Sequence, residues 1–174
     1  MAWTSPRTWV SGELVTASLM NTHIRDNETF LYGSIVKHAA AGYRTTTTQV
    51  VATGTVTALI TNAEWFDVDN CLSTSTGLYT APEAGKYILY GFISIESPAA
   101  SACGGHAYVN STAQTLHSVS VALDSQMVFC GGVFSVAASD TLSVRGYHNR
   151  GSNTAFLNLS SGAAMSWFFC AQIG

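Results

Sequence analysis

Residues 86–96 carry the most informative hydrophobic pattern of the chain, because both faces of the strand that they predict are apolar. Side chains alternate across a strand, so a sheet with one solvated face shows polar residues at every second position. Here one alternate set is Tyr87, Leu89, Gly91, Ile93 and Ile95, and the other is Ile88, Tyr90 and Phe92. With no helix predicted to cover the second face, the strand needs another copy of the chain or a partner there.

The C-terminal run, residues 163–173, shows the same lack of a polar face. Its alternate sets are Met165, Trp167, Phe169 and Ala171, and Ser166, Phe168, Cys170 and Gln172. Two strands of this kind indicate a sheet that packs inside a sandwich and also against other subunits. We therefore predict an interface between copies of the chain that includes Tyr87, Tyr90, Phe92, Trp167 and Phe169.

Beyond residue 43 the chain consists of predicted strands and turns. Thr-rich and aromatic runs recur about every ten residues with Gly, Asn, Asp and Pro between them, which favours a β-sandwich over an α/β plan. The predicted strands span residues 44–52, 55–60, 64–69, 77–80, 86–96, 105–110, 114–123, 126–136, 141–148, 153–159 and 163–173.

Residues 16–32 predict one helix, with Thr16 placed as its N-cap and Gly33 at its C-terminal end. Positions spaced by three and four residues form a heptad seam with one polar member, namely Ala17, Met20, Ile24, Asn27 and Leu31. A lone Asn in such a seam can fix the register and oligomeric state of a coiled coil. The pattern predicts either an interface between copies through Met20, Ile24, Asn27 and Leu31, or an amphipathic helix that lies on its own domain.

Residues 1–14 form an irregular arm that holds two of the four tryptophans. Trp is enriched at buried contacts, so the arm is either a docking anchor, through Trp3, Trp9 and Leu14, or a segment folded back on its own domain.

The predicted organisation is an arm and helix over residues 1–33, a linker rich in Ala, Gly and Thr over residues 34–48, and a β-domain over residues 49–174.

Charge is scarce in this chain of 174 residues. Charged residues make up 10% of it, against about 25% in ordinary soluble domains, which indicates a surface largely occupied by contacts. The net charge of -3 and the lack of a basic cluster argue against nucleic acid as a partner. No apolar run has the length of a membrane span and no N-terminal signal segment is apparent, so we expect synthesis in a cytoplasm and no membrane partner.

Residue types that carry catalysis or bind metals are scattered along the chain. The five histidines have no second ligand two or four positions away, and the zinc-protease, serine-nucleophile and phosphate-loop motifs are absent. Asp67, Asp69 and Asn70 offer oxygens that suit calcium, but turn residues that bond the nearby backbone explain them better. The four cysteines lie far apart and predict small buried side chains rather than disulfides. We predict no enzyme activity, no metal and no cofactor.

The segment from Trp9 to Asn27 carries a spaced motif. Trp9, Gly12-Glu13, Thr16-Ala17, Asn21 and Ile24-Arg25-Asp26-Asn27 resemble the W-x-x-G-E-x-x-T-A-x-x-x-N-x-x-I-R-D-N opening of many phage tail-fibre and minor virion proteins. The resemblance implies a virion-associated N-terminal segment, and hence a virion protein that is made in the cytoplasm of a host bacterium.

A second resemblance covers the β-domain. Phe66-Asp67, residues 76–82 (TGLYTAP), 85–87 (GKY), 140–144 (DTLSV) and 166–168 (SWF) are similar, in order, to strand landmarks of the complement globular-head and tumour-necrosis-factor superfamily. This resemblance implies a mainly β fold, a jelly-roll β-sandwich preceded by the arm and one short helix. It also implies a compact homotrimer whose inner sheets pack around a three-fold axis. The small residues of 97–105 and the lack of a collagen-like stalk depart from the family, so ligand specificity does not follow.

Two functions are consistent with these features. The first is a homotrimeric structural protein of a bacteriophage particle, either a capsid decoration or head-fibre protein or a short tail-fibre module, with capsid or tail proteins as partners. The alternative is a receptor- or glycan-binding head for host attachment. Its shallow sites between protomers would be lined by Tyr43, Tyr108, Tyr147, His148 or Asn149.

Overall fold

The structure, a computed structural model, describes residues 4–5, 7–28, 37–45, 49–96, 102–119, 125–152, 154–156 and 166–173. The chain divides into two compact units, Met1–Lys37 and His38–Gly174. The second unit therefore begins inside the predicted linker over residues 34–48, earlier than the predicted start of the β-domain at residue 49.

The first unit contains a short helix. Thr16 is its N-cap as predicted, because its Oγ1 accepts a hydrogen bond from the Leu19 amide at 3.3 Å. Helix α1 (Ala17–Met20) continues into a π-helical segment, η1 (Asn21–Arg25), and residues 26–28 are again α-helical. No helix in the described ranges is long and apolar enough to cross a membrane. The predicted helix end at Gly33 lies outside the described residues.

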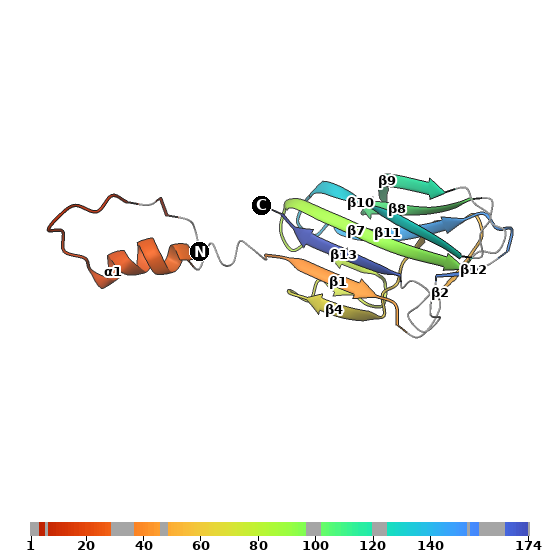
Figure 1. Ribbon diagram of the computed structural model, residues 1–174, viewed down its shortest axis with the longest axis horizontal. Helices are drawn as coiled ribbons and strands as arrows, with labels where there is room; N and C mark the ends of the chain where they lie inside the picture. Colours follow the sequence, from red (N-terminus) through yellow and green to blue (C-terminus); the bar gives the residue numbers. More distant parts are fainter. Residues whose placement is uncertain are drawn as a thin grey trace. The chain divides into compact units, whose positions relative to one another are not determined.

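The second unit is a sandwich of two antiparallel sheets (Figure 1), which confirms the predicted jelly-roll β-sandwich. The first sheet runs in the order β2 (Gln49–Val51), β12 (Thr154–Phe156), β7 (Gly85–Glu96), β13 (Trp167–Gln172), β1 (Ala39–Tyr43) and β4 (Ala63–Asp67), with β10 (Ser125–Val136) paired to β7. The second sheet runs in the order β5 (Leu72–Ser73), β6 (Leu78–Thr80), β11 (Thr141–His148), β8 (Cys103–Val109) and β9 (Thr112–Val119), with β3 (Thr57–Ala58) paired to β11.

Strand β7 lies inside the first sheet, between β10 on one edge and β13 on the other. The alternate set that begins at Tyr87 faces the second sheet and is buried throughout, whereas Ile88, Tyr90 and Phe92 face outward and are partly exposed. The two apolar sets expected from the sequence are therefore an inner, packed face and an outer face that the protomer leaves partly uncovered.

The two sheets approach each other closely at Gly91. A Cβ added to Gly91 would lie 2.4 Å from Val144 Cγ2 and 2.5 Å from Val144 Cγ1, a separation that real atoms do not adopt. Val144 belongs to β11 in the opposite sheet and is 1% exposed. Glycine at this position lets the core close between the two layers.

Strand β1 falls in the region predicted as a linker, so that prediction is wrong for residues 39–43. Its pattern of Ala and Gly is unfavourable for strands in general. Here the small side chains are required by packing, because β1 lies between β13 and β4 and a Cβ on Gly42 would lie 2.7 Å from Thr61 Oγ1. The two-residue strand β5 was also not predicted.

Candidate functional site

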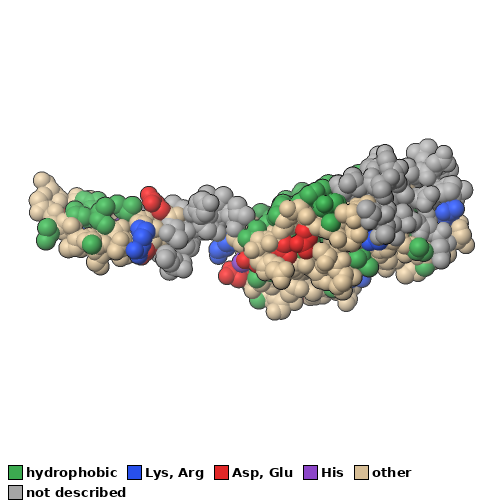
Figure 2. Space-filling model, turned by 90° about the horizontal axis from the view of Figure 1, so that it is seen from below, with side chains coloured by type: hydrophobic (Ala, Val, Ile, Leu, Met, Phe, Trp, Pro, Cys, Tyr) green, Lys and Arg blue, Asp and Glu red, His purple; other side chains and the backbone are tan. Residues whose placement is uncertain are grey.

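The outer side of the first sheet carries a set of aromatic side chains, which we call the aromatic face. Trp65 on β4 is 51% exposed and Phe129 on β10 is 49% exposed, although both side chains are large and apolar. Figure 2 shows hydrophobic side chains gathered along one side of the sandwich. The aromatic face consists of Tyr43, Trp65, Phe66, Tyr90, Phe92, Phe129, Trp167 and Phe169.

Ring contacts link these side chains in three groups, which lie on five neighbouring strands. Tyr43 stacks on Trp65 with centroids 4.8 Å apart, and Phe92 stacks on Trp167 at 6.4 Å. On the two flanks, Tyr90 meets Phe129 at 5.3 Å, and Phe66 meets Phe169 edge-on at 6.4 Å. A register shift opposite Ala41 and Gly42 allows the consecutive residues Trp65 and Phe66 to contact rings of the same face. Exposed apolar patches of this kind mark interaction surfaces.

Four of the predicted interface residues lie on the aromatic face and are partly exposed, namely Tyr90, Phe92, Trp167 and Phe169. The prediction is wrong for Tyr87, which is 0% exposed in the core between the sheets. Its hydroxyl donates to the Glu83 carbonyl at 3.0 Å, and burial raises the pKa of that hydroxyl. Because β7 has two apolar alternate sets, its own sequence does not distinguish the inner set from the outer one.

Trp65, Phe66 and Phe129 are members of the aromatic face that the sequence reasoning did not identify. The run Phe129-Gly131-Val133 alternates on β10, and its residues pair with Phe92, Tyr90 and Ile88 of β7. This alternation was a usable signal for Phe129. The bulge that turns Trp65 outward leaves no local mark in the sequence.

The N-terminal unit is a folded structure rather than an extended arm. Asn27, only 6% exposed, accepts a hydrogen bond from the Thr4 amide at 3.0 Å through its Oδ1. Its Nδ2 donates to the Thr4 carbonyl at 2.9 Å and to the His23 carbonyl at 3.4 Å. The carboxamide of Asn27 thus fastens the start of the arm to the helix.

The turn before the helix is held by Glu13. Its carboxylate pairs with the Arg7 guanidinium and accepts from the Val10 amide at 3.3 Å. Gly12, at φ 81°, adopts the left-handed conformation that glycine favours. Arg7 lies 4.7 Å from the Trp9 ring centroid, and Trp9 meets His23 edge-on at 6.3 Å. The residues of the Trp9–Asn27 motif therefore support one another within a single turn-and-helix unit.

The predicted docking and seam residues have different environments. Leu14 is 81% exposed, and Trp9, Met20 and Ile24 are each more than 40% exposed, so all four are accessible within the unit. The predicted role of Asn27 in a seam between copies is wrong, because its side chain is buried against the arm. Trp3 and Leu31 lie outside the described residues.

The predicted receptor residues do not form one site. Tyr108 and Tyr147 lie on the outer side of the second sheet, where the Arg145 guanidinium stacks 4.0 Å above the Tyr108 ring. Tyr43 lies on the first sheet, in the aromatic face. The Asn149 side chain accepts from the Ala102 amide at 2.7 Å.

His148 was also predicted as a receptor contact, and that prediction is wrong. It is 0% exposed, and its Nε2 lies 3.0 Å from the Val51 carbonyl. Its Nδ1 accepts from the Arg150 amide at 3.3 Å, which assigns the proton to Nε2. His106 lies between Tyr108 and Tyr147 on the outer side of the second sheet, and burial lowers its pKa.

Polar side chains in the turn after β4 have local partners. Asp67 accepts from the Leu72 amide at 2.7 Å, as expected for a turn residue. Asp69 instead pairs with His38, 2.6 Å between Oδ2 and Nδ1. Among the described residues, no three His, Cys, Asp or Glu side chains group closely enough to hold a metal ion.

Neither a protein-family model nor a curated protein matches the sequence. Solved structures do match the fold. The globular domain of the zebrafish complement 1qA protein superimposes with a TM-score of 0.57 at 14% identity, covering 79% of this chain and 98% of that chain. Murine APRIL gives 0.57 at 15% identity, covering 79% and 100%. The PRD1 vertex protein P5 gives 0.56 at 12% identity, covering 80% and 99%. At these identities the likeness concerns the fold alone, and the fold is a jelly-roll β-sandwich similar to those of these proteins.

Proposed function

We propose that this protein is a homotrimeric structural protein of a bacteriophage particle. Its sandwich domains associate through the aromatic face, and its N-terminal unit attaches the trimer to a capsid or tail protein. The protein would be made in the host bacterial cytoplasm and would reside in the virion, with no catalytic role. The aromatic face is the single observation that carries the self-association.

The aromatic face suits another copy of the chain as its cover. None of its eight side chains carries a charge, so identical faces can approach a common axis without like-charge repulsion. Apolar and aromatic burial of this kind dominates the energetics of stable interfaces. The resemblance to the complement and tumour-necrosis-factor superfamily implies three copies, with the inner sheet of each protomer packed around a three-fold axis.

The N-terminal unit supplies the attachment. Its motif from Trp9 to Asn27 resembles the opening of phage tail-fibre and minor virion proteins, and the unit displays Leu14, Met20 and Ile24 to solvent. The fold of the PRD1 vertex protein P5, which resembles the sandwich, also supports a place on a particle. Capsid decoration or head fibre and short tail fibre are the two placements that this attachment would serve.

Sedimentation equilibrium tests the trimer. The full chain should sediment at three times the 18.4 kDa of one protomer at micromolar concentration. Phe129→Asp should sediment as a monomer, because a buried, unpaired carboxylate is strongly unfavourable at an interface. Thr112→Asp, at an exposed position on β9, is the matched control and should remain trimeric. A monomeric wild-type protein would refute the trimer.

Deletion of residues 1–33 tests the attachment separately. The truncated protein should still form a trimer in solution, because the aromatic face lies in the second unit. It should be lost from purified particles, whereas the full chain is incorporated. Unchanged incorporation of the truncated protein would remove the docking role while leaving the trimer intact. Electron microscopy of labelled particles would then distinguish capsid from tail.

A second function, recognition of the host surface, is favoured by the outer side of the second sheet. Tyr108 and Tyr147 are partly exposed there, and Arg145 is held over Tyr108 by hydrogen bonds to Ser143 Oγ at 3.2 Å and to the Asn110 carbonyl at 3.1 Å. Purified protein should compete with phage for adsorption to cells if it binds a receptor. A pure decoration protein should not compete, and its omission should instead lower capsid stability.

A further inference from the structure

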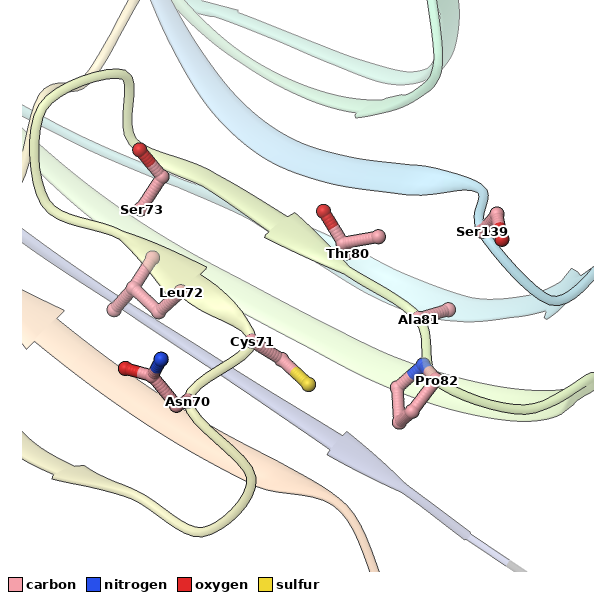
Figure 3. A pocket seen from close by; sticks show the side chains of 8 residues that line it. All are labelled: Asn70, Cys71, Leu72, Ser73, Thr80, Ala81, Pro82 and Ser139. Atoms are coloured by element: carbon pink, nitrogen blue, oxygen red, sulfur yellow. The ribbon is translucent and has the colours of Figure 1, made fainter.

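A pocket of 520 Å³ opens beside strands β5 and β6, on the second sheet. Figure 3 shows residues 70–73 and residues 80–82 contributing to its wall, together with Ser139 from the turn between β10 and β11. These segments are held together by backbone hydrogen bonds: the Thr80 amide donates to the Cys71 carbonyl, and the Ser139 amide donates to the Ala81 carbonyl, each at 2.8 Å. The pocket is therefore part of the folded framework.

The lining combines an apolar base with a polar, uncharged rim. Leu72 and Ala81 are 5% and 1% exposed and form the buried part of the wall. No lining residue is Asp, Glu, Lys, Arg or His. Hydroxyl and amide groups are supplied by Ser73, Thr80, Ser139 and Asn70.

The carboxylates nearest in sequence to the lining residues have partners of their own. Glu83, next to Pro82, has its Oε2 3.7 Å from His38 Nε2. Asp69 pairs with His38, and Asp67 accepts from the Leu72 amide. Asp140 accepts from Asn110 Nδ2 at 2.8 Å and from the Ala137 amide at 2.9 Å. The pocket therefore offers no charged side chain for selecting a metal ion, a phosphate group or a carboxylate ligand.

We propose that this pocket binds a neutral saccharide unit. Sugar hydroxyls both donate and accept hydrogen bonds, as the serine, threonine and asparagine side chains of the rim do. A C–H face of a sugar ring would pack against Pro82, which is exposed at the rim, and the volume lies in the range of small-molecule sites, about 300–1,000 Å³. The inference gives the host-recognition function a specific site, and it rests on that function for its role in infection.

Cys71 makes binding measurable, because it lines the pocket and is partly exposed while the other three cysteines are buried. The probes are glucose, galactose and N-acetylglucosamine, each titrated against labelling of the full chain by a maleimide at pH 8. A sugar that occupies the pocket at ten times its Kd should slow the labelling of Cys71 about tenfold. Chemical shifts of the amides of residues 70–73 should move over the same concentration range.

Two variants and a control locate the effect. Thr80→Trp should abolish the protection by filling the pocket, and Thr112→Trp, at an exposed position of β9, should retain it. Asn70→Gly should weaken binding severalfold without backbone strain, because Asn70 has φ 55° and glycine accepts that conformation. The proposal is overturned if none of the three sugars protects Cys71 or shifts the pocket amides, or if Thr80→Trp binds as the wild type does. None of these readouts depends on trimer formation or on adsorption to cells, so a failure of the pocket is distinguishable from a failure of either proposed function.

Discussion

Asn27 binds Thr4 through both ends of its carboxamide, which occupies the amide and the carbonyl of one residue 23 positions away. Asn27 is 6% exposed and Thr4 is half-buried, so water has little access to the carboxamide while the arm is closed. Asn27→Ala leaves both Thr4 groups without this partner, at a cost of about 1–3 kcal/mol. We expect hydrogen exchange at the Thr4 amide to accelerate about tenfold or more.

The control for this prediction is Asn21→Ala, because Asn21 lies on the same helix with an exposed side chain. It should leave exchange at Thr4 unchanged. Equal exchange in Asn27→Ala and in the wild type would show that the arm is held by other contacts, such as the pairing of Arg7 with Glu13.

Gly91→Ala should destabilise the sandwich, because the new methyl group would overlap the Val144 side chain across the core. Overpacking of this kind costs about 1–3 kcal/mol. Val144→Ala is also destabilising, but the cavity that it leaves would receive the Gly91→Ala methyl group. The loss in free energy of unfolding of the double variant should therefore be smaller than the sum of the losses of the two single variants, by a coupling energy of about 0.5–3 kcal/mol. Urea unfolding of the four proteins checks this, and strict additivity would show that the two sites do not contact each other.

Strand periodicity is the part of the fold that the sequence predicts best, because alternation is local. β11 has the predicted bounds, residues 141–148, and β7 differs from its prediction by one residue. β1 was missed for a physical reason: Ala and Gly are unfavourable for strands in general, and Ala39–Tyr43 is a strand because it pairs with β13 and β4, which its own sequence does not show.

The candidate site could be predicted only in part for the same reason. The side chains of Tyr87 and Tyr90 look equivalent in sequence, and only the position of the second sheet makes one a core residue and the other a surface residue. The spacing of Asn27 suits a heptad seam, but its partner Thr4 lies in an arm without periodicity. The pocket wall joins three separate segments, and no single one of them carries a recognisable motif.

Cys71 should be the thiol that reacts in the native protein. Cys103, Cys130 and Cys170 are buried, whereas Cys71 is partly exposed. Burial raises the pKa of Cys71 as well as that of Cys130, to about 12, and that of Cys170, so access to the reagent is what distinguishes Cys71. Ellman's reagent at pH 8 should therefore modify one thiol per native chain and all four after denaturation. Cys71→Ser should abolish the native reaction. Modification of two or more thiols on the native timescale would indicate that the core opens readily.

Stability should fall in acid partly through Asp140. The hydrogen bond from Asn110 Nδ2, and secondly that from the Ala137 amide, lowers the pKa of this carboxyl in the folded state. Because the pKa of Asp140 is lower in the folded state, its ionised carboxylate contributes to stability in full above its pKa in the unfolded chain, about 3.9. That contribution to stability is lost as the pH falls through the pKa of the folded state. Asp140→Asn, which lacks the titrating group, should be less stable than the wild type at pH 6, and the difference should shrink below pH 4. Urea unfolding across this range measures the difference, and one that stayed constant from pH 6 to pH 2 would show that ionised Asp140 does not stabilise the turn.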